Sequence, residues 1–127
     1  MFMKKISFLI LLLTLSIVCG SCKKNDEIPS CLTGIVLGPA NNFICTILIQ
    51  VTNAKVGTPF TYQSKNYDYV IQTSSDVGPN RLKKIYFTYR QYTKHELDSL
   101  GGKCISQDIP PNVPEYNITK YSTTKCP

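Results

Sequence analysis

Cysteine is the residue type with the clearest chemical potential in this chain of 127 residues, which contains six. Four of the six follow the first thirty residues: Cys31, Cys45, Cys104 and Cys126. An even number of cysteines in a small exported domain predicts two disulfide bonds. Zinc is the competing interpretation, but these four cysteines form no Cys-x-x-Cys, and the chain has a single histidine. We therefore expect disulfides, no metal and no other cofactor.

The single histidine, His95, is the best candidate for a general base. It lies beside Glu96 in a segment expected to be an exposed helix, and no nucleophile motif accompanies it. The chain has no Gly-x-Ser-x-Gly, P-loop or dinucleotide-binding glycine pattern, and its acids are scattered. The sequence predicts no catalytic residues and a protein that is not an enzyme. A small hydrolase with a site built from distant residues is an alternative.

Basic and aromatic residues are interleaved between positions 81 and 94. Aromatic rings stack on sugars or bases and cations attract phosphates, so this segment is a candidate binding surface. Ordinary strand composition gives the same pattern, because tyrosine is enriched in strands and Lys and Arg solvate outer faces. The candidate binding surface comprises Arg81, Lys83, Lys84, Tyr86, Arg90 and Tyr92.

A proline-rich segment, residues 109–114, contains Pro110, Pro111 and Pro114. Proline fixes φ and removes a backbone donor, so we expect this segment to be extended, unpaired and stiff. A stiff loop loses little entropy on binding and could insert into an extracellular enzyme, as inhibitors do. The alternative interpretation is a plain connection between two strands.

The N-terminus has the organisation of an export signal. A basic start, with Lys4 and Lys5, precedes the uncharged residues 6–18, which are too few to span a bilayer. Cys19-Gly20-Ser21-Cys22 follows, and small residues precede Cys22. This stretch resembles the lipobox of bacterial lipoproteins. The resemblance implies that residues 1–21 are a signal peptide and that Cys22 carries lipid, which anchors the chain in a membrane.

Residues 22–30 read as a lipid-anchored flexible tether, because they are polar, charged and end near a proline. The formal net charge of the whole chain is +6, from 14 Lys and Arg and 8 Asp and Glu. Loss of Lys4 and Lys5 with the signal peptide would leave 12 basic residues and a net charge of +4. That balance is mild for a nucleic-acid binder, so we expect no nucleic-acid partner.

Period-two hydrophobicity predicts five strands in residues 31–127, which we expect to form a single β domain. Thr93 and Glu96 form a capping box that predicts a two-turn helix ending before Gly101. Residues 55–65 read as a long loop. In the strand at 84–92, Ile85, Phe87 and Tyr89 should face inward. The expected strands are 32–37, 43–53, 67–73, 84–92 and 116–122.

Five short strands and one short helix indicate a mainly β fold, and we expect a five-stranded OB-like barrel, closed or half-closed, or a β-sandwich. An open sheet is a further alternative. The disulfide pairing remains open. Proximity in the sequence favours Cys31–Cys45 with Cys104–Cys126. A closed barrel would bring the first and last strands together and would favour Cys31–Cys126.

The chain as a whole resembles small lipoproteins of Gram-negative bacteria. Cys31-Leu32-Thr33-Gly34, then Ile49-Gln50-Val51-Thr52-Asn53-Ala54 and Ile85-Tyr86-Phe87-Thr88-Tyr89-Arg90, carry this resemblance beyond the lipobox. It implies an outer-membrane lipoprotein at the periplasmic face or the cell surface. Asp98-Ser99-Leu100 also resembles an O-glycosylation acceptor of some Gram-negative export pathways, which makes Ser99 a candidate acceptor.

The leading hypothesis is a lipid-anchored envelope protein that acts as a non-enzymatic binding or accessory module. Its expected partners are the membrane, through the anchor, and an envelope protein or a glycan. The first alternative is an inhibitor or binder of an extracellular enzyme that uses residues 109–114. The sequence leaves the oligomeric state open.

Overall fold

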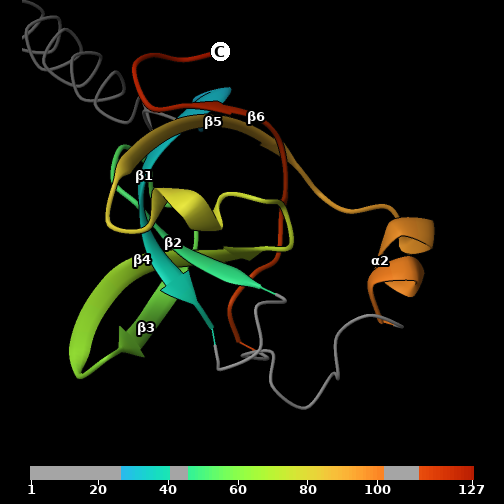
Figure 1. Cartoon of the computed structure of the whole chain (residues 1–127), viewed down its shortest axis with the longest axis horizontal. Coiled ribbons are helices and arrows are strands. Elements are labelled where there is room, and N and C mark those ends of the chain that lie inside the picture. Colours follow the sequence, from blue (N-terminus) through green and yellow to red (C-terminus); the bar gives the residue numbers. More distant parts are fainter. Residues whose placement is uncertain (1–26, 41–45, 102–111) are drawn as a thin grey trace, which may run out of the picture.

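The computed structural model describes residues 27–40, 46–101 and 112–127 of the chain. Strands dominate these residues, and the helices are one 3₁₀ turn and one short α-helix (Figure 1). The elements are β1 (Cys31–Pro39), β2 (Ile47–Val51), β3 (Thr58–Tyr62), β4 (Lys65–Thr73), η1 (Gly78–Asn80), β5 (Lys84–Arg90), α2 (Lys94–Gly101) and β6 (Asn117–Ser122). The expectation of a mainly β fold with one short helix is confirmed.

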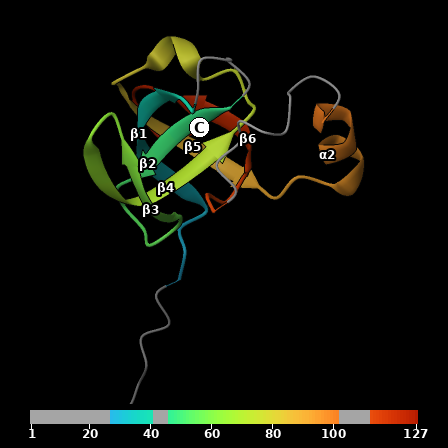
Figure 2. The same cartoon turned by 90° about the horizontal axis from the view of Figure 1, so that it is seen from below.

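All six strands belong to one antiparallel sheet in the order β3-β4-β2-β1-β5-β6. The described residues thus form a single open sheet of six strands, and neither a closed five-stranded barrel nor a sandwich of two sheets. The strands curve around a common core (Figures 1 and 2). A single parallel bridge, between Gln72 of β4 and Glu115 ahead of β6, links two distant parts of this curved sheet.

The additional strand is β3, which lies within the segment expected to be a loop. The turn from β3 to β4 contains Gln63 and Ser64, both with positive φ (49° and 66°). A tight hairpin of this kind is usually signalled by Asn-Gly or Asp-Gly, so the sequence lacked its strongest cue. Gly57 enters β3 with φ of 117°, and a Cβ there would lie 2.5 Å from the Val70 carbonyl oxygen. Backbone packing therefore requires glycine at this position.

The main core lies on one face of the sheet and confirms the inward direction predicted for β5. Ile85 and Phe87 are fully buried, whereas Tyr89 is half-buried at the border of the core. Eleven buried side chains form this main core: Leu32, Val36, Ile47, Ile49, Val51, Val56, Ile71, Val77, Ile85, Phe87 and Ile118.

A smaller apolar cluster contains residues of β1, β2 and β4. The register between β1 and β2 shifts between Val36 and Gly38. Val36 belongs to the main core and the adjacent Leu37 to the smaller cluster, because successive side chains of a strand point to opposite faces of the sheet. Aromatic residues of the β3–β4 hairpin pack against this cluster, and the Tyr62 hydroxyl donates to the Pro39 carbonyl oxygen at 3.0 Å. The buried members are Leu37, Leu48, Val70 and Val113.

A disulfide joins Cys31, at the start of β1, to Cys126, near the C-terminus. β5 lies between β1 and β6, and Cys31 and Lys120 both pair with Thr88. After Ser122 the chain turns, with the Thr124 amide donating to the Ser122 hydroxyl at 3.2 Å, and Cys126 reaches Cys31. The pairing of Cys31 with Cys45 and of Cys104 with Cys126 is therefore wrong. The alternative pairing, Cys31 with Cys126, is the one observed, although the sheet is open and does not form the closed barrel on which that alternative was based.

The capping box at the start of α2 is confirmed. The Thr93 amide donates to Glu96 Oε2 at 2.9 Å, and the Glu96 amide donates to the Thr93 hydroxyl at 3.3 Å. These bonds satisfy backbone donors that a helix start leaves free. Both views show α2 set apart from the sheet, on the chain that leaves β5 (Figures 1 and 2).

Candidate functional site

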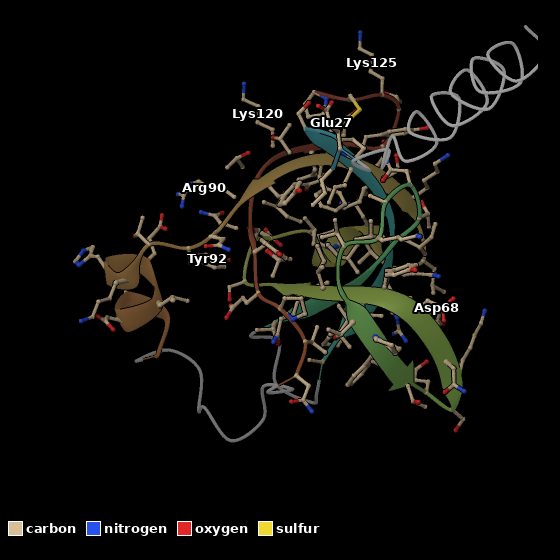
Figure 3. All side chains as sticks on the ribbon, turned by 180° about the vertical axis from the view of Figure 1, so that it is seen from behind. Glu27, Asp68, Arg90, Tyr92, Lys120 and Lys125 are labelled. Atoms are coloured by element: carbon tan, nitrogen blue, oxygen red, sulfur yellow. A yellow bond between two sulfur atoms is a disulfide. The ribbon has the colours of Figure 1, made fainter. Side chains whose placement is uncertain are left out.

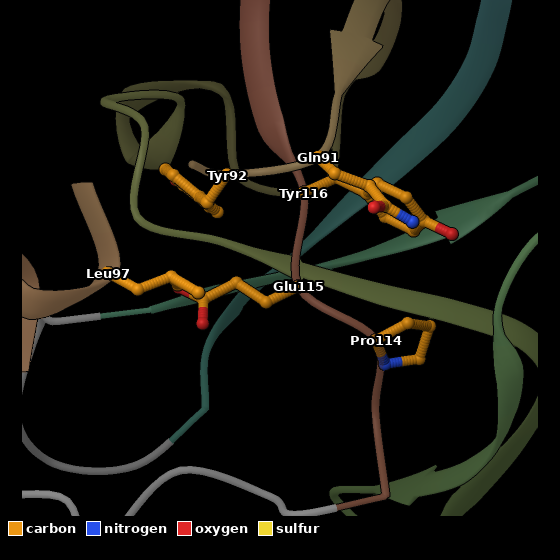
Figure 4. A pocket seen from close by; sticks show the side chains of 6 residues that line it. All are labelled: Gln91, Tyr92, Leu97, Pro114, Glu115 and Tyr116. Carbon is orange, nitrogen blue, oxygen red and sulfur yellow. The ribbon is translucent and has the colours of Figure 1, made fainter. Parts of the chain in front are cut away.

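A cavity of about 290 Å³ lies between the end of β5, α2 and the segment that leads into β6. Its size is at the lower end of ligand-binding pockets. Figure 4 shows the side chains around it, with Leu97 coming from α2 and extending toward Glu115 in this view. The residues that line the cavity are Gln91, Tyr92, Leu97, Pro114, Glu115 and Tyr116.

One wall of the cavity is fixed to β4 by backbone hydrogen bonds. The Gln72 amide donates to the Pro114 carbonyl oxygen, and the Tyr116 amide donates to the Gln72 carbonyl oxygen, both at 2.9 Å. The Gln72 side chain donates to the carbonyl oxygen of Val113 at 2.7 Å, and Val113 is itself buried. The end of the proline-rich segment is therefore packed against the sheet.

Polar contacts to Ser74, just after β4, tie two lining residues to the sheet. The Ser74 hydroxyl donates to Glu115 Oε1 at 2.8 Å. The Ser74 amide donates to the Tyr92 hydroxyl oxygen at 3.1 Å. One serine thus positions both the carboxylate and the phenol of the cavity.

An aromatic series connects the main core to the cavity. The rings of Phe87 and Tyr89 meet edge to face with centroids 6.4 Å apart, and those of Tyr89 and Tyr116 do so at 5.3 Å. Such edge contacts are favourable beyond the area they bury. Burial, together with the nearby Tyr116, raises the pKa of Tyr89 above its usual value of 10.0. Tyr89 therefore stays neutral. Its ring contact with Tyr116 supports that side chain in the wall of the cavity.

A bidentate ion pair fixes the base of α2. Arg90 Nη2 lies 2.6 Å from Glu96 Oε1, and Arg90 Nη1 lies 2.8 Å from Glu96 Oε2. The hydrogen bonds from Arg90, and next that from the Thr93 amide, lower the pKa of Glu96 from 4.5 to about 2. Glu96 is therefore ionised at neutral pH and holds both the helix start and Arg90.

The cavity combines aromatic rings with one amide and one carboxylate. Tyr92 and Tyr116 offer flat apolar faces, while Gln91 and Glu115 offer hydrogen-bond groups. This combination suits a small ligand with both an apolar face and hydroxyl groups. Glu115 is the sole acid among the described lining residues, whereas paired-carboxylate hydrolysis uses two. The sequence's candidate base, His95, is exposed on α2 and does not line the cavity.

The structure divides the predicted basic and aromatic surface between the two ends of β5. Arg90 and Tyr92 lie at the end of β5 that leads to α2, between the sheet and that helix (Figure 3). Lys84 begins the strand six residues earlier, about 20 Å away at the rise of a β-strand. The extended strand thus separates the two groups of the candidate binding surface, and binding at this surface remains a prediction. Arg81, Lys83 and Lys84 remain together at one end, with the Lys84 ammonium 5.3 Å from the centroid of the Tyr86 ring.

Of the remaining predicted site residues, the structure describes Ser99 but not the lipidation site or two of the cysteines. Ser99 is exposed on α2, and its hydroxyl donates to the His95 carbonyl oxygen at 2.9 Å. Its glycosylation remains a prediction. The following residues lie outside those that the structure describes: Cys22, Cys45, Cys104, Pro110 and Pro111.

Four of the six lining residues were missed from the sequence: Gln91, Leu97, Glu115 and Tyr116. Pro114 was noted as part of a loop and Tyr92 as part of the basic surface. The two lining segments are about twenty residues apart in the chain, and no local motif marks either as part of a cavity. A weak signal was available in Glu115-Tyr116, where a carboxylate and a ring follow the proline-rich segment.

No family model and no curated protein matches the chain. Within residues 27–40, 46–101 and 112–127, no three His, Cys, Asp or Glu side chains are grouped so that they could hold a metal ion. No helix in the described part of the chain is long and apolar enough to cross a membrane.

Proposed function

We propose that this chain is a lipid-anchored envelope protein whose β domain binds a small saccharide in the cavity beside α2, without catalysing a reaction. The observation that carries the proposal is the lining of the cavity, where the Tyr92 and Tyr116 side chains lie with the Gln91 amide and the Glu115 carboxylate. Sugars present a flat apolar C–H face and a rim of hydroxyls, which rings and polar side chains complement.

The rigidity of the cavity wall supports binding as its role. Tyr116 is supported by Tyr89 and by its backbone bond to Gln72, and Glu115 is oriented by Ser74. Groups that are already in place lose less entropy when a ligand binds. A lone carboxylate, with His95 outside the cavity, favours recognition over acid–base chemistry.

We propose that the curved sheet is a partly open barrel of the OB type. Five of the strands follow the order β4-β2-β1-β5-β6, and the parallel bridge from Gln72 to Glu115 brings the last of them toward the first. An OB domain is a five-stranded, partly open Greek-key barrel that binds oligomeric ligands with one face and its adjoining loops. In this proposal β3 is an additional strand, which comes between β2 and β4 in the chain and lies at the edge of the sheet.

The proposed anchor is lipid on Cys22, in the outer membrane, with the β domain at the periplasmic face or the cell surface. Its support is the lipobox-like order of basic start, apolar segment and cysteine. The Cys31–Cys126 disulfide supports an oxidising compartment, because such bonds are rare in the cytosol.

Saccharide binding is tested with full-length protein and a panel of soluble mono- and disaccharides, by saturation-transfer NMR followed by titration. We expect Tyr116→Ala to weaken binding by at least about tenfold, which is about 1.4 kcal/mol. Tyr121→Ala is the matched control, because Tyr121 is an exposed tyrosine on β6 that does not line the cavity. Equal losses in the two variants, or no saccharide bound by the unaltered protein, would reject the cavity as a saccharide site.

Lipid anchoring is tested by metabolic labelling with palmitate. The unaltered protein should incorporate label and fractionate with membranes, and Cys22→Ser should abolish both. Cys19→Ser is the matched control and should retain the label, because Ile17 and Val18 before it are bulky. Label that persists in the Cys22→Ser protein would contradict the assignment.

A further inference from the structure

The turn between η1 and β5 presents a leucine to solvent among three cations. Leu82 is 73% exposed, the largest value among the large hydrophobic residues that the structure describes as exposed. Arg81, Lys83 and Lys84 flank it and are themselves exposed. We call residues 81–84 the basic tip.

Backbone hydrogen bonds hold the basic tip in a conformation that leucine disfavours. Leu82 has φ of 63°, in the left-handed region, where its Cβ crowds the following carbonyl. The Leu82 amide donates to the Val36 carbonyl oxygen at 2.7 Å, and the Val36 amide donates to the Lys83 carbonyl oxygen at 3.1 Å. The Lys83 amide donates to the Asn80 carbonyl oxygen at 2.8 Å. Glycine or asparagine would suit this position, yet it carries a leucine that points away from the core.

The three cations of the basic tip make no ion pair with any residue that the structure describes. The pair between Arg90 and Glu96, at the far end of β5, is the one salt bridge in the described part of the chain. The positive charge at the tip is therefore available to an external anion.

We infer that the basic tip binds an anionic lipid surface, with Leu82 inserted among the acyl chains and Arg81, Lys83 and Lys84 at the headgroup phosphates. A single protruding apolar side chain flanked by cations matches an interface where hydrocarbon lies beneath negative charge. An acidic protein would attract the same cations, but protein interfaces favour a packed patch of anchors, whereas Leu82 projects alone.

The position of the basic tip is compatible with the proposed anchor. Val36, which bonds to the tip, lies five residues along β1 from Cys31, or about 17 Å. Eight residues separate Cys22 from Cys31, and eight residues span at most about 25–29 Å. An anchored domain could therefore place its tip on the same membrane. Tip insertion does not require the anchor, so the two proposals can fail independently.

The chain has no tryptophan, so L82W introduces a reporter at the tip without background. Full-length L82W protein is mixed with vesicles of phosphatidylcholine alone or with added phosphatidylglycerol. We expect a blue-shifted emission, quenched by brominated acyl chains, only with the anionic vesicles. Y121W is the control reporter, and its emission should not change even if the N-terminal segment carries the chain to the vesicle. Unchanged emission of L82W, or equal shifts in both proteins, overturns the inference.

Two further comparisons identify the contributions of charge and of the leucine. In L82W protein, replacing Arg81, Lys83 and Lys84 by Gln should weaken the vesicle response about fivefold per cation. Replacing Lys55, Lys120 and Lys125 removes the same charge elsewhere and should weaken it less.

L82N should raise the melting temperature, because asparagine tolerates positive φ, while reducing binding to anionic vesicles. Retained binding in L82N, or an L82W response to polyglutamate but not to vesicles, overturns the inference in favour of a protein partner.

Discussion

The sheet core and the chain around α2 are stabilised by different kinds of contact. The main core buries Phe87, Ile85 and Ile49 completely and relies on apolar packing within hydrogen-bonded strands. The α2 arm, which we define as residues 93–101, relies on the capping box and on the Arg90–Glu96 pair. Burial in the core gives large, salt-independent stability, whereas exposed ionic contacts give little and respond to pH.

This difference places the candidate site at the boundary between a rigid and an adaptable region. Tyr116 and Glu115 are fixed to the sheet through Gln72 and Ser74, whereas Leu97 comes from the arm. A ligand in the cavity would contact both regions.

The largest effect is expected in the core. Phe87→Ala should lower the free energy of unfolding by about 3–5 kcal/mol, because it leaves a cavity in a fully packed site. Urea denaturation followed by circular dichroism measures this. The matched control is Tyr86→Ala, which truncates the half-buried neighbour on the outer face and should cause a clearly smaller loss. Similar losses would show that the two faces of β5 are not distinguished by burial.

The second largest effect on stability is expected from loss of the disulfide. Replacing both Cys31 and Cys126 by Ala should lower the free energy of unfolding by about 2–5 kcal/mol, because their separation of 95 residues closes a long loop in the unfolded chain. The double replacement also prevents new pairings with Cys45 or Cys104. Saccharide binding should survive, because the disulfide joins β1 to the C-terminal residues and neither cysteine lines the cavity. Loss of binding in a folded double variant would show that the two regions are coupled.

Ser74 should give an intermediate effect at the boundary. Ser74→Ala removes the hydrogen bond that orients Glu115 and should lower stability by about 1 kcal/mol. We also expect weaker saccharide binding, measured by the same NMR titration. Ser99→Ala removes an exposed serine hydrogen bond within α2 and should change neither quantity appreciably. An equal effect of the two changes would contradict the role given to Ser74.

The smallest effect is expected in the α2 arm and depends on pH. The pKa of Glu96 is lowered to about 2 in the folded protein, so the unfolded chain takes up its proton first as pH falls. The stabilisation by Glu96 is therefore full above about pH 4.5, its ordinary value, and is lost as pH falls through about 2. Carboxyl chemical shifts and amide exchange in α2 would report this, and Glu96→Gln should remove the dependence. A Glu96 that titrates near 4.5 would contradict the ion pair.

Local patterns explain why parts of the fold were predictable. Ile85 and Phe87 alternate with polar neighbours, so their burial follows from the period of a strand. Thr93 and Glu96 are three residues apart and meet through local geometry alone. β3 escaped prediction because Gln63 and Ser64 adopt positive φ without glycine or asparagine, a conformation that pairing with β4 must impose.

The class of the fold, the capped helix and the set of cysteines available for bonding follow from the order of the amino acids. These features depend on neighbours within one turn or one strand. The tertiary structure alone decided that Cys31 meets Cys126, that Tyr92 and Tyr116 share a cavity, and that Leu82 points outward. Each of these depends on which strands lie side by side and in what register, and that choice is made by burial summed over the whole sheet.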